Sequence, residues 1–145
     1  FLPYGACVDH FQHWVYENYD ASPKERKQKW LQLESIYLPQ RDYDNMVFAK
    51  DGGIWQGQLH IYQMPFYYID YTLAQTCAFQ FWIKSEQDKD QAWKNYMNLC
   101  KAGGSLSFTK LIELAQLDSP FKDGCLENVV DYVEDWLNNF EIENI

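Results

Sequence analysis

Apolar residues recur along most of the chain at the spacing of α-helices, and no stretch of any length alternates as a strand would. A first helix is predicted from Cys7 to Glu17. The next begins more sharply, because Ser22 can cap it, Pro23 suits its first position and Glu25 completes a capping box. That helix should end before Pro39, since the residue preceding a proline disfavours the helical conformation. Its core side is predicted to carry Trp30, Leu33 and Tyr37.

The second half of the chain is also predicted to be helical. A polar connector from Gln40 to Gly53 and a short segment, Ile54 to Gln63, precede it. Proline and serine start signals and glycine stops then predict four further helices. They run from Pro65 to about Lys84, from Glu86 to Ala102 after a Ser85 cap, from Ser107 to Leu117, and from Cys125 to Phe140. The last is predicted to turn seven residues inward: Leu126, Val129, Val130, Val133, Trp136, Leu137 and Phe140.

These elements predict an all-α fold. With 145 residues, of which 47% are hydrophobic and 18% aromatic, the chain can bury a sizeable core. We therefore expect a single helical domain over residues 1–145. The sequence begins with Phe1 rather than Met, so we expect it to start inside a longer protein.

Charge and cysteine content narrow the possible partners and location. A net charge of −9 argues against nucleic acid, whose phosphates need clustered Lys and Arg. No membrane helix is expected, because the most apolar stretch, Phe66 to Ile83, is interrupted by Asp70, Gln75 and Gln80. The four cysteines are widely spread and form no Cys-x-x-Cys pair, which predicts reduced thiols in a cytoplasmic protein.

Polar side chains form a stripe on the predicted helix that follows Pro65. Tyr68, Tyr71, Thr72 and Gln75 fall at i, i+3, i+4 and i+7, so they share one face of an otherwise apolar helix. Either the tyrosine hydroxyls reach backbone carbonyls in a core, or they line a cleft and donate to a ligand. Spacing alone leaves both interpretations open.

Two further groups could carry chemistry. Gly52 and Gly53 allow a mobile or closely approached loop, and His60 follows it closely enough to point toward the same cleft. On the first predicted helix, Asp9, His13 and Glu17 share a face beside His10, which makes a metal site conceivable. However, the sequence there is not a His-Glu-x-x-His motif, and structural hydrogen bonds are the simpler interpretation.

Two blocks of sequence resemble the oligoendopeptidase F family of zinc metallopeptidases, relatives of thimet oligopeptidase. They are His60 to Gln75 (HIYQMPFYYIDYTLAQ) and Val8 to Asn18 (VDHFQHWVYEN). The resemblance implies a helical enzyme that cleaves short peptides in a deep channel with Zn²⁺. The family's His-Glu-x-x-His zinc motif is absent from this sequence, so the resemblance places it before Phe1 and implies roughly the last quarter of such an enzyme.

The resemblance also implies roles for individual residues. Tyr68 and Tyr71 match a Tyr-x-x-Tyr pair that contacts the substrate backbone and the tetrahedral intermediate, and His60 matches a histidine that supports them. A phenol stays protonated at neutral pH and donates without adding charge, so either tyrosine can serve as the oxyanion donor. We assign Tyr71 as the leading oxyanion donor and Tyr68 as a substrate-backbone contact, although nothing in the sequence distinguishes this order from its reverse. The Gly52-Gly53 loop is similar to the family's mobile loop over the cleft.

One departure from the family pattern leaves a tyrosine unplaced. Thimet oligopeptidase carries a further Tyr and a Gly pair between its His and its Tyr-x-x-Tyr, whereas Ile61 to Phe66 here holds no glycine and only Tyr62. Tyr62 and Tyr67 are the remaining candidates for substrate binding.

The sequence leaves two alternatives to a peptidase fragment. One is a stand-alone, non-catalytic helical module that binds a partner. The other is a metal-binding domain that uses His10, His13 and Glu17.

Overall fold

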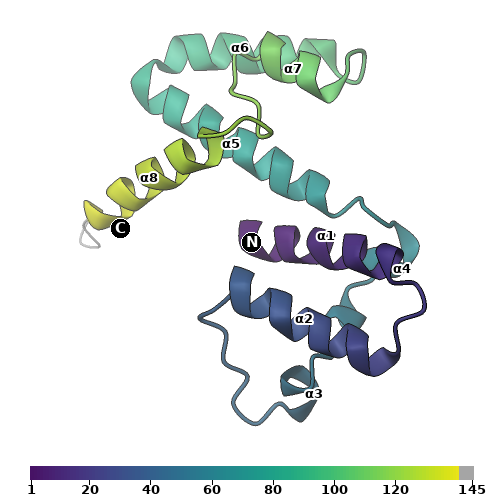
Figure 1. Cartoon of the computed structure of the whole chain (residues 1–145). Coiled ribbons are helices and arrows are strands. Elements are labelled where there is room, and N and C mark those ends of the chain that lie inside the picture. Colours follow the sequence, from purple (N-terminus) through teal and green to yellow (C-terminus); the bar gives the residue numbers. More distant parts are fainter. Residues whose placement is uncertain (141–145) are drawn as a thin grey trace. The chain divides into compact units, whose positions relative to one another are not determined.

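The structure, a computed structural model, describes residues 1–140 and is helical throughout (Figure 1). No strand occurs within those residues, and the predicted all-α fold is confirmed. The elements are α1 (Leu2–Glu17), α2 (Pro23–Tyr37), α3 (Val47–Lys50), the 3₁₀ helix η1 (Ile54–Gly57), α4 (His60–Gln63), α5 (Ile69–Gln87), α6 (Lys89–Ala102), α7 (Phe108–Leu114) and α8 (Cys125–Asn138).

The chain divides into two compact units, Phe1–Leu73 and Ala74–Ile145, each with its own core. In the described part of the chain, no helix is long and apolar enough to cross a membrane. All four cysteines are free, as their spacing predicts.

The core of the first unit lies between α1 and α2, which run side by side in opposite directions (Figure 1). Phe11 of α1 is fully buried, with its ring centroid 5.4 Å from that of Trp30 on α2 and 5.0 Å from that of Trp55 in η1. Leu33 is buried beside them, as predicted, and Tyr37 is partly buried against the same core. Six residues make up this core: Cys7, Val8, Phe11, Trp30, Leu33 and Trp55.

The start and end of α2 follow the sequence signals. The Ser22 hydroxyl accepts a hydrogen bond from the Glu25 amide at 3.3 Å, and the Glu25 carboxylate accepts one from the Ser22 amide at 2.7 Å. This is the predicted capping box, and the helix ends at Tyr37, before Pro39. α1 begins earlier than predicted, at Leu2, because Pro3 is compatible with the first helical turn.

The start of α5 differs from the prediction in a way that matters for the site. The helix begins at Ile69 rather than at Pro65, because Phe66 adopts a left-handed backbone conformation with φ of 62°. A right-handed helix cannot continue through such a residue. Tyr68 therefore lies just before the helix, and the predicted stripe is helical only from Tyr71 onward.

The predicted Ser85 cap is wrong. Ser85 lies inside α5 and its hydroxyl donates to the Trp82 carbonyl at 2.7 Å, a bond that serine commonly makes within helices. The cap of α6 is Asp88, whose carboxylate accepts from the Gln91 amide at 3.0 Å. α6 ends at Gly103, as predicted, where φ is +54°.

The second unit has a smaller core around Ile112, Ala115 and Leu117. The buried Gln80 side chain ties α5 to the segment after α7, because it donates to the Asp118 carbonyl at 2.9 Å and accepts from the Asp118 amide at 2.8 Å. α7 ends at Leu114, earlier than predicted. Gln116 has a φ of 55°, so a right-handed helix cannot continue through it.

The apolar face of α8 is largely uncovered, contrary to the prediction. Val129 is buried and Val133 is half-buried, and Trp136 contacts Trp82 with ring centroids 5.5 Å apart. The amphipathic pattern is correct, but the described residues do not supply a surface large enough to cover it. Five of the residues predicted to face inward are exposed: Leu126, Val130, Trp136, Leu137 and Phe140.

Candidate functional site

Three tyrosines surround His60, the first residue of α4. The ring centroid of His60 lies 5.0 Å from that of Tyr68, 5.8 Å from that of Tyr71 and 6.5 Å from that of Tyr67. Tyr71 in turn lies 5.7 Å from Tyr68 and 5.3 Å from Tyr67. The structure therefore brings together four of the residues singled out in the sequence, and we call His60, Tyr67, Tyr68 and Tyr71 the tyrosine cluster.

Backbone geometry explains how residues near in sequence converge. The turn between α4 and α5 contains Phe66 in its left-handed conformation, which redirects the chain before Tyr67 and Tyr68. The Phe66 ring packs on α1, with its centroid 4.8 Å from that of His13 and 4.9 Å from that of Tyr16. A bulky residue with positive φ is uncommon, and these contacts hold it in place.

The tyrosine hydroxyls of the cluster are suited to donate hydrogen bonds. The pKa of Tyr71 is raised, mainly by its hydrogen bond with Tyr67 and then by desolvation, and the pKa of Tyr68 is raised by burial. Both phenols therefore stay protonated well above neutral pH. Tyr71 is 42% exposed and Tyr67 is 38% exposed, so these side chains are open to a ligand on this surface of the unit.

His60 also takes part in a set of hydrogen-bond contacts. The Tyr4 hydroxyl donates to Gln58 Oε1 at 2.9 Å, and Gln58 Nε2 lies 2.8 Å from His60 Nδ1. Neither Tyr4 nor Gln58 was predicted as a site residue. Sequence spacing carries no signal for this contact, because 54 positions separate Tyr4 from Gln58.

Tyr62 lies outside the tyrosine cluster. Its ring stacks on Trp55 at a centroid distance of 6.1 Å, and it is exposed. The structure thus brings Tyr67, but not Tyr62, to His60.

Gly52 and Gly53 are buried rather than projecting into solvent. Gly52 has φ of +77°, and a Cβ atom there would overlap the backbone carbonyl oxygen of Lys27 on α2. The backbone of this loop therefore approaches α2 more closely than any other residue type would allow. Packing explains the glycine at position 52, and the mobile-loop role of the pair stays a prediction.

Replacing Gly52 with alanine should destabilise the protein by more than about 1 kcal/mol, because both the positive φ and the contact with Lys27 oppose a side chain. Gly53→Ala is the matched control. Position 53 has an ordinary φ of −87°, and the added methyl would meet the Phe48 ring, a half-exposed side chain that can move. Chemical denaturation of the two variants checks this, and equal losses would contradict the backbone explanation.

Asp9, His10 and His13 of α1 make contacts within the first unit. His13 Nε2 lies 3.4 Å from the Asp9 carboxylate, and His10 Nδ1 lies 3.1 Å from the Tyr37 hydroxyl. Within residues 1–140, no three His, Cys, Asp or Glu side chains lie close enough to hold a metal ion. The hypothesis of a metal site at His10, His13 and Glu17 therefore finds no support in the described structure.

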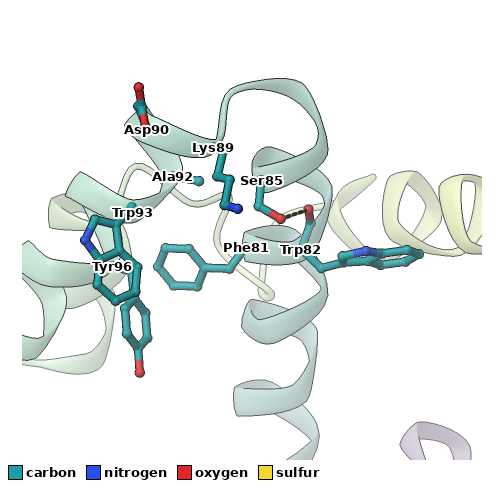
Figure 2. A pocket seen from close by; sticks show the side chains of 8 residues that line it. All are labelled: Phe81, Trp82, Ser85, Lys89, Asp90, Ala92, Trp93 and Tyr96. Atoms are coloured by element: carbon teal, nitrogen blue, oxygen red, sulfur yellow. Dashed lines mark hydrogen bonds between the residues drawn. The ribbon is translucent and has the colours of Figure 1, made fainter.

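An apolar pocket lies in the second unit (Figure 2). It has a volume of about 550 Å³ between α5 and α6, and Phe81 points toward Trp93 and Tyr96 across it (Figure 2). Asp90 points away from its interior (Figure 2). Most of its lining is apolar, and the Ser85 hydroxyl already donates to the Trp82 carbonyl, so we place the candidate site at the tyrosine cluster instead.

Comparisons with known proteins agree on one family. The sequence profile of Peptidase family M3 matches residues 1–131 of the chain. A structure described as a candidate oligoendopeptidase F is 52% identical with a TM-score of 0.93, and the match covers 100% of this chain and 26% of that chain. PZ peptidase A, solved with an inhibitor, is 55% identical with a TM-score of 0.92, and the match covers 97% of this chain and 25% of that chain.

A third structure, described as a candidate oligoendopeptidase F from Bacillus anthracis strain Ames, is 45% identical with a TM-score of 0.77, over 100% of this chain and 22% of that chain. Among curated protein sequences, none matches significantly. The chain thus spans between 22% and 26% of the length of these solved structures.

Proposed function

Because the chain belongs to peptidase family M3, we propose that it is the C-terminal, substrate-binding portion of a zinc-dependent oligoendopeptidase that hydrolyses short peptides. The observation that carries the proposal is the tyrosine cluster, in which His60, Tyr68 and Tyr71 face one another at ring distances of 5.0 to 5.8 Å. Three hydrogen-bonding side chains at this spacing can contact adjacent polar atoms of one peptide.

Each residue of the cluster has a role in this proposal. The Tyr71 hydroxyl donates to the oxygen of the scissile carbonyl as negative charge develops there, and Tyr68 binds the peptide backbone. His60 donates to the same carbonyl oxygen in support of Tyr71. Preorganised neutral donors of this kind stabilise an oxyanion without reorganisation during the reaction. Tyr67 holds the Tyr71 hydroxyl by a hydrogen bond until substrate takes its place.

On this proposal, the zinc ion is not held by the residues of this chain. Within the part of the chain that the structure describes, no suitable group of His, Cys, Asp or Glu side chains converges, and the sequence lacks a His-Glu-x-x-His motif. On this proposal, the Zn²⁺ ligands lie in the rest of the peptidase chain, and the 145 residues alone bind no zinc and cleave no peptide.

The remainder of the peptidase is also the main partner of this chain. The exposed apolar residues of α8, including Leu137 at 61% exposure, fit a surface that packs against that remainder. Residues 1–145 then form part of one catalytic domain, and both compact units belong to it. The free cysteines fit a reducing compartment, so the cytoplasm is the proposed location.

The test of this function uses the full-length protein and short internally quenched peptides. Hydrolysis of these peptides, but not of a folded protein substrate, together with one tightly held zinc ion per chain in elemental analysis, is the expected result. The non-catalytic binding module predicts neither. A full-length protein that holds no zinc and cleaves none of the peptides would overturn the proposal.

A further inference from the structure

We propose that Gln58 is a positioning residue that holds His60 in the tautomer with its proton on Nε2, so that this nitrogen donates to the substrate carbonyl. The inference rests on the proposed function, because it specifies how the supporting donor of that site is prepared. It concerns residues of the first unit only, contributed by α1, by the segment after η1 and by α4.

The contact between Gln58 and His60 has a defined polarity. Gln58 Nε2 lies 2.8 Å from His60 Nδ1, and Gln58 Oε1 accepts from the Tyr4 hydroxyl at 2.9 Å. An amide has one donor end and one acceptor end, so the two contacts are linked. In the structure the amide oxygen is directed to Tyr4 and the amide nitrogen to His60.

Packing holds the Tyr4 end of this chain of hydrogen bonds. The Tyr4 ring meets Trp30 edge to face at 6.2 Å and Tyr68 at 5.9 Å, and the Arg41 guanidinium lies 5.1 Å from its centroid. Burial raises the pKa of Tyr4 to about 12, so its hydroxyl keeps its proton throughout the pH range of a peptidase assay. The Tyr4 hydroxyl therefore keeps a proton to donate to Gln58 Oε1, and packing holds its ring in place.

The polarity of Gln58 determines which nitrogen of His60 carries the proton. When Nδ1 accepts a hydrogen bond from an amide N–H, the neutral imidazole must carry its proton on Nε2. Nε2 is then a donor, and the ring that carries it faces the tyrosine cluster. The other tautomer would present a lone pair to the carbonyl oxygen and repel it.

The groups that contact His60 allow a pH profile to test this proposal. Among the described residues, His60 contacts Gln58 and the rings of Tyr67, Tyr68 and Tyr71, and none of these side chains is a carboxylate or a cation. The pKa of Tyr71 is raised mainly by its hydrogen bond with Tyr67, with a smaller contribution from the Asp70 carboxylate. Tyr68 and Tyr71, whose pKa values are raised, therefore keep their protons near neutral pH.

The decisive substitution is Gln58→Glu in the full-length peptidase. A glutamate has the same length and still accepts from Tyr4, but it has no N–H to offer and instead accepts from His60 Nδ1–H. Neutral His60 then has a bare Nε2, and only the imidazolium can donate to the substrate. The ratio of variant to wild-type kcat should therefore fall by about tenfold from about pH 5 to about pH 8, the interval in which imidazole side chains generally change charge, while KM changes little.

Gln56→Glu is the matched control, because the substitution adds the same charge. Gln56 is exposed in η1 and, within the described residues, makes no hydrogen bond to His60. The ratio of the kcat of this variant to that of the wild type should not change with pH. A kcat ratio for Gln58→Glu that does not change with pH would overturn the proposal. An equal fall of the kcat ratio with pH in both variants would also overturn it, since that fall would come from the added charge alone.

A spectroscopic measurement tests the tautomer without relying on activity. In full-length protein labelled with ¹⁵N-histidine and held above the titration range, His60 should show Nε2 in the N–H range and Nδ1 in the bare-nitrogen range. The signals are assigned by their loss in His60→Gln, and the pattern should reverse in Gln58→Glu. A proton on Nδ1 in the wild type would overturn the proposal even if the enzyme is a peptidase, whereas an inactive protein with the expected tautomer would overturn only the proposed function.

Discussion

Tyr71→Phe in the full-length peptidase should lower kcat by about 10²- to 10³-fold, which corresponds to about 2.7–4 kcal/mol of transition-state stabilisation. The substitution removes one hydroxyl and leaves a ring that keeps its contacts with His60, Tyr67 and Tyr68. Since Tyr71 is partly exposed, the loss of its hydroxyl leaves no buried acceptor unpaired. The effect should therefore appear in catalysis and not in stability.

Steady-state kinetics with a quenched peptide, together with zinc content, provide the measurement. A role as oxyanion donor predicts that kcat and kcat/KM fall together while KM and bound zinc stay nearly unchanged, because the interaction forms only in the transition state. Tyr19→Phe is the matched control, since Tyr19 is 82% exposed and lies outside the tyrosine cluster. Wild-type turnover in Tyr71→Phe would exclude the proposed role.

Phe11→Ala should destabilise the protein by about 3–5 kcal/mol, the range found for truncating a buried aromatic side chain. Phe11 is fully buried and its ring contacts Trp14, Trp30 and Trp55, so the substitution leaves a cavity between α1, α2 and η1. These rigid aromatic neighbours cannot collapse readily into the space, which places the expected loss toward the upper part of the range.

Denaturant unfolding followed by tryptophan fluorescence measures this loss, because Trp30 and Trp55 report directly on the cavity. Tyr19→Ala removes a side chain of similar size from the surface and should change the free energy of unfolding by less than about 0.5 kcal/mol. Comparable losses in the two variants would contradict the assignment of Phe11 to the core of the first unit.

Local sequence signals were most reliable where one short segment decides the conformation. The capping box at Ser22 and Glu25 and the stop before Pro39 set both ends of α2, because each depends on hydrogen bonds or sterics within a few residues. Ser85 shows the limit of this reasoning. It has a side chain suited to a cap, but Asp88 was equally suited, and the structure uses Asp88 while α5 continues through Ser85.

The amphipathic pattern of α8 correctly predicted a helix, but it did not predict which residues of its apolar face are buried. Hydrophobic spacing determines which side chains share a face, whereas burial depends on whether another surface meets that face. Within the described residues the face of α8 meets Trp82 and little else, so Val130 and Leu137 remain exposed.

For the candidate site, the sequence by itself determined the residue types: two tyrosines three positions apart, a histidine shortly before them and the resemblance that links them to a peptidase family. Only the tertiary structure decided how they meet. The left-handed Phe66 moves Tyr68 out of the helix and toward His60, and the fold brings Tyr4 to Gln58 across 54 positions. Such contacts form between segments that sequence spacing does not relate, because they depend on the packing of α1 beside the turn that precedes α5.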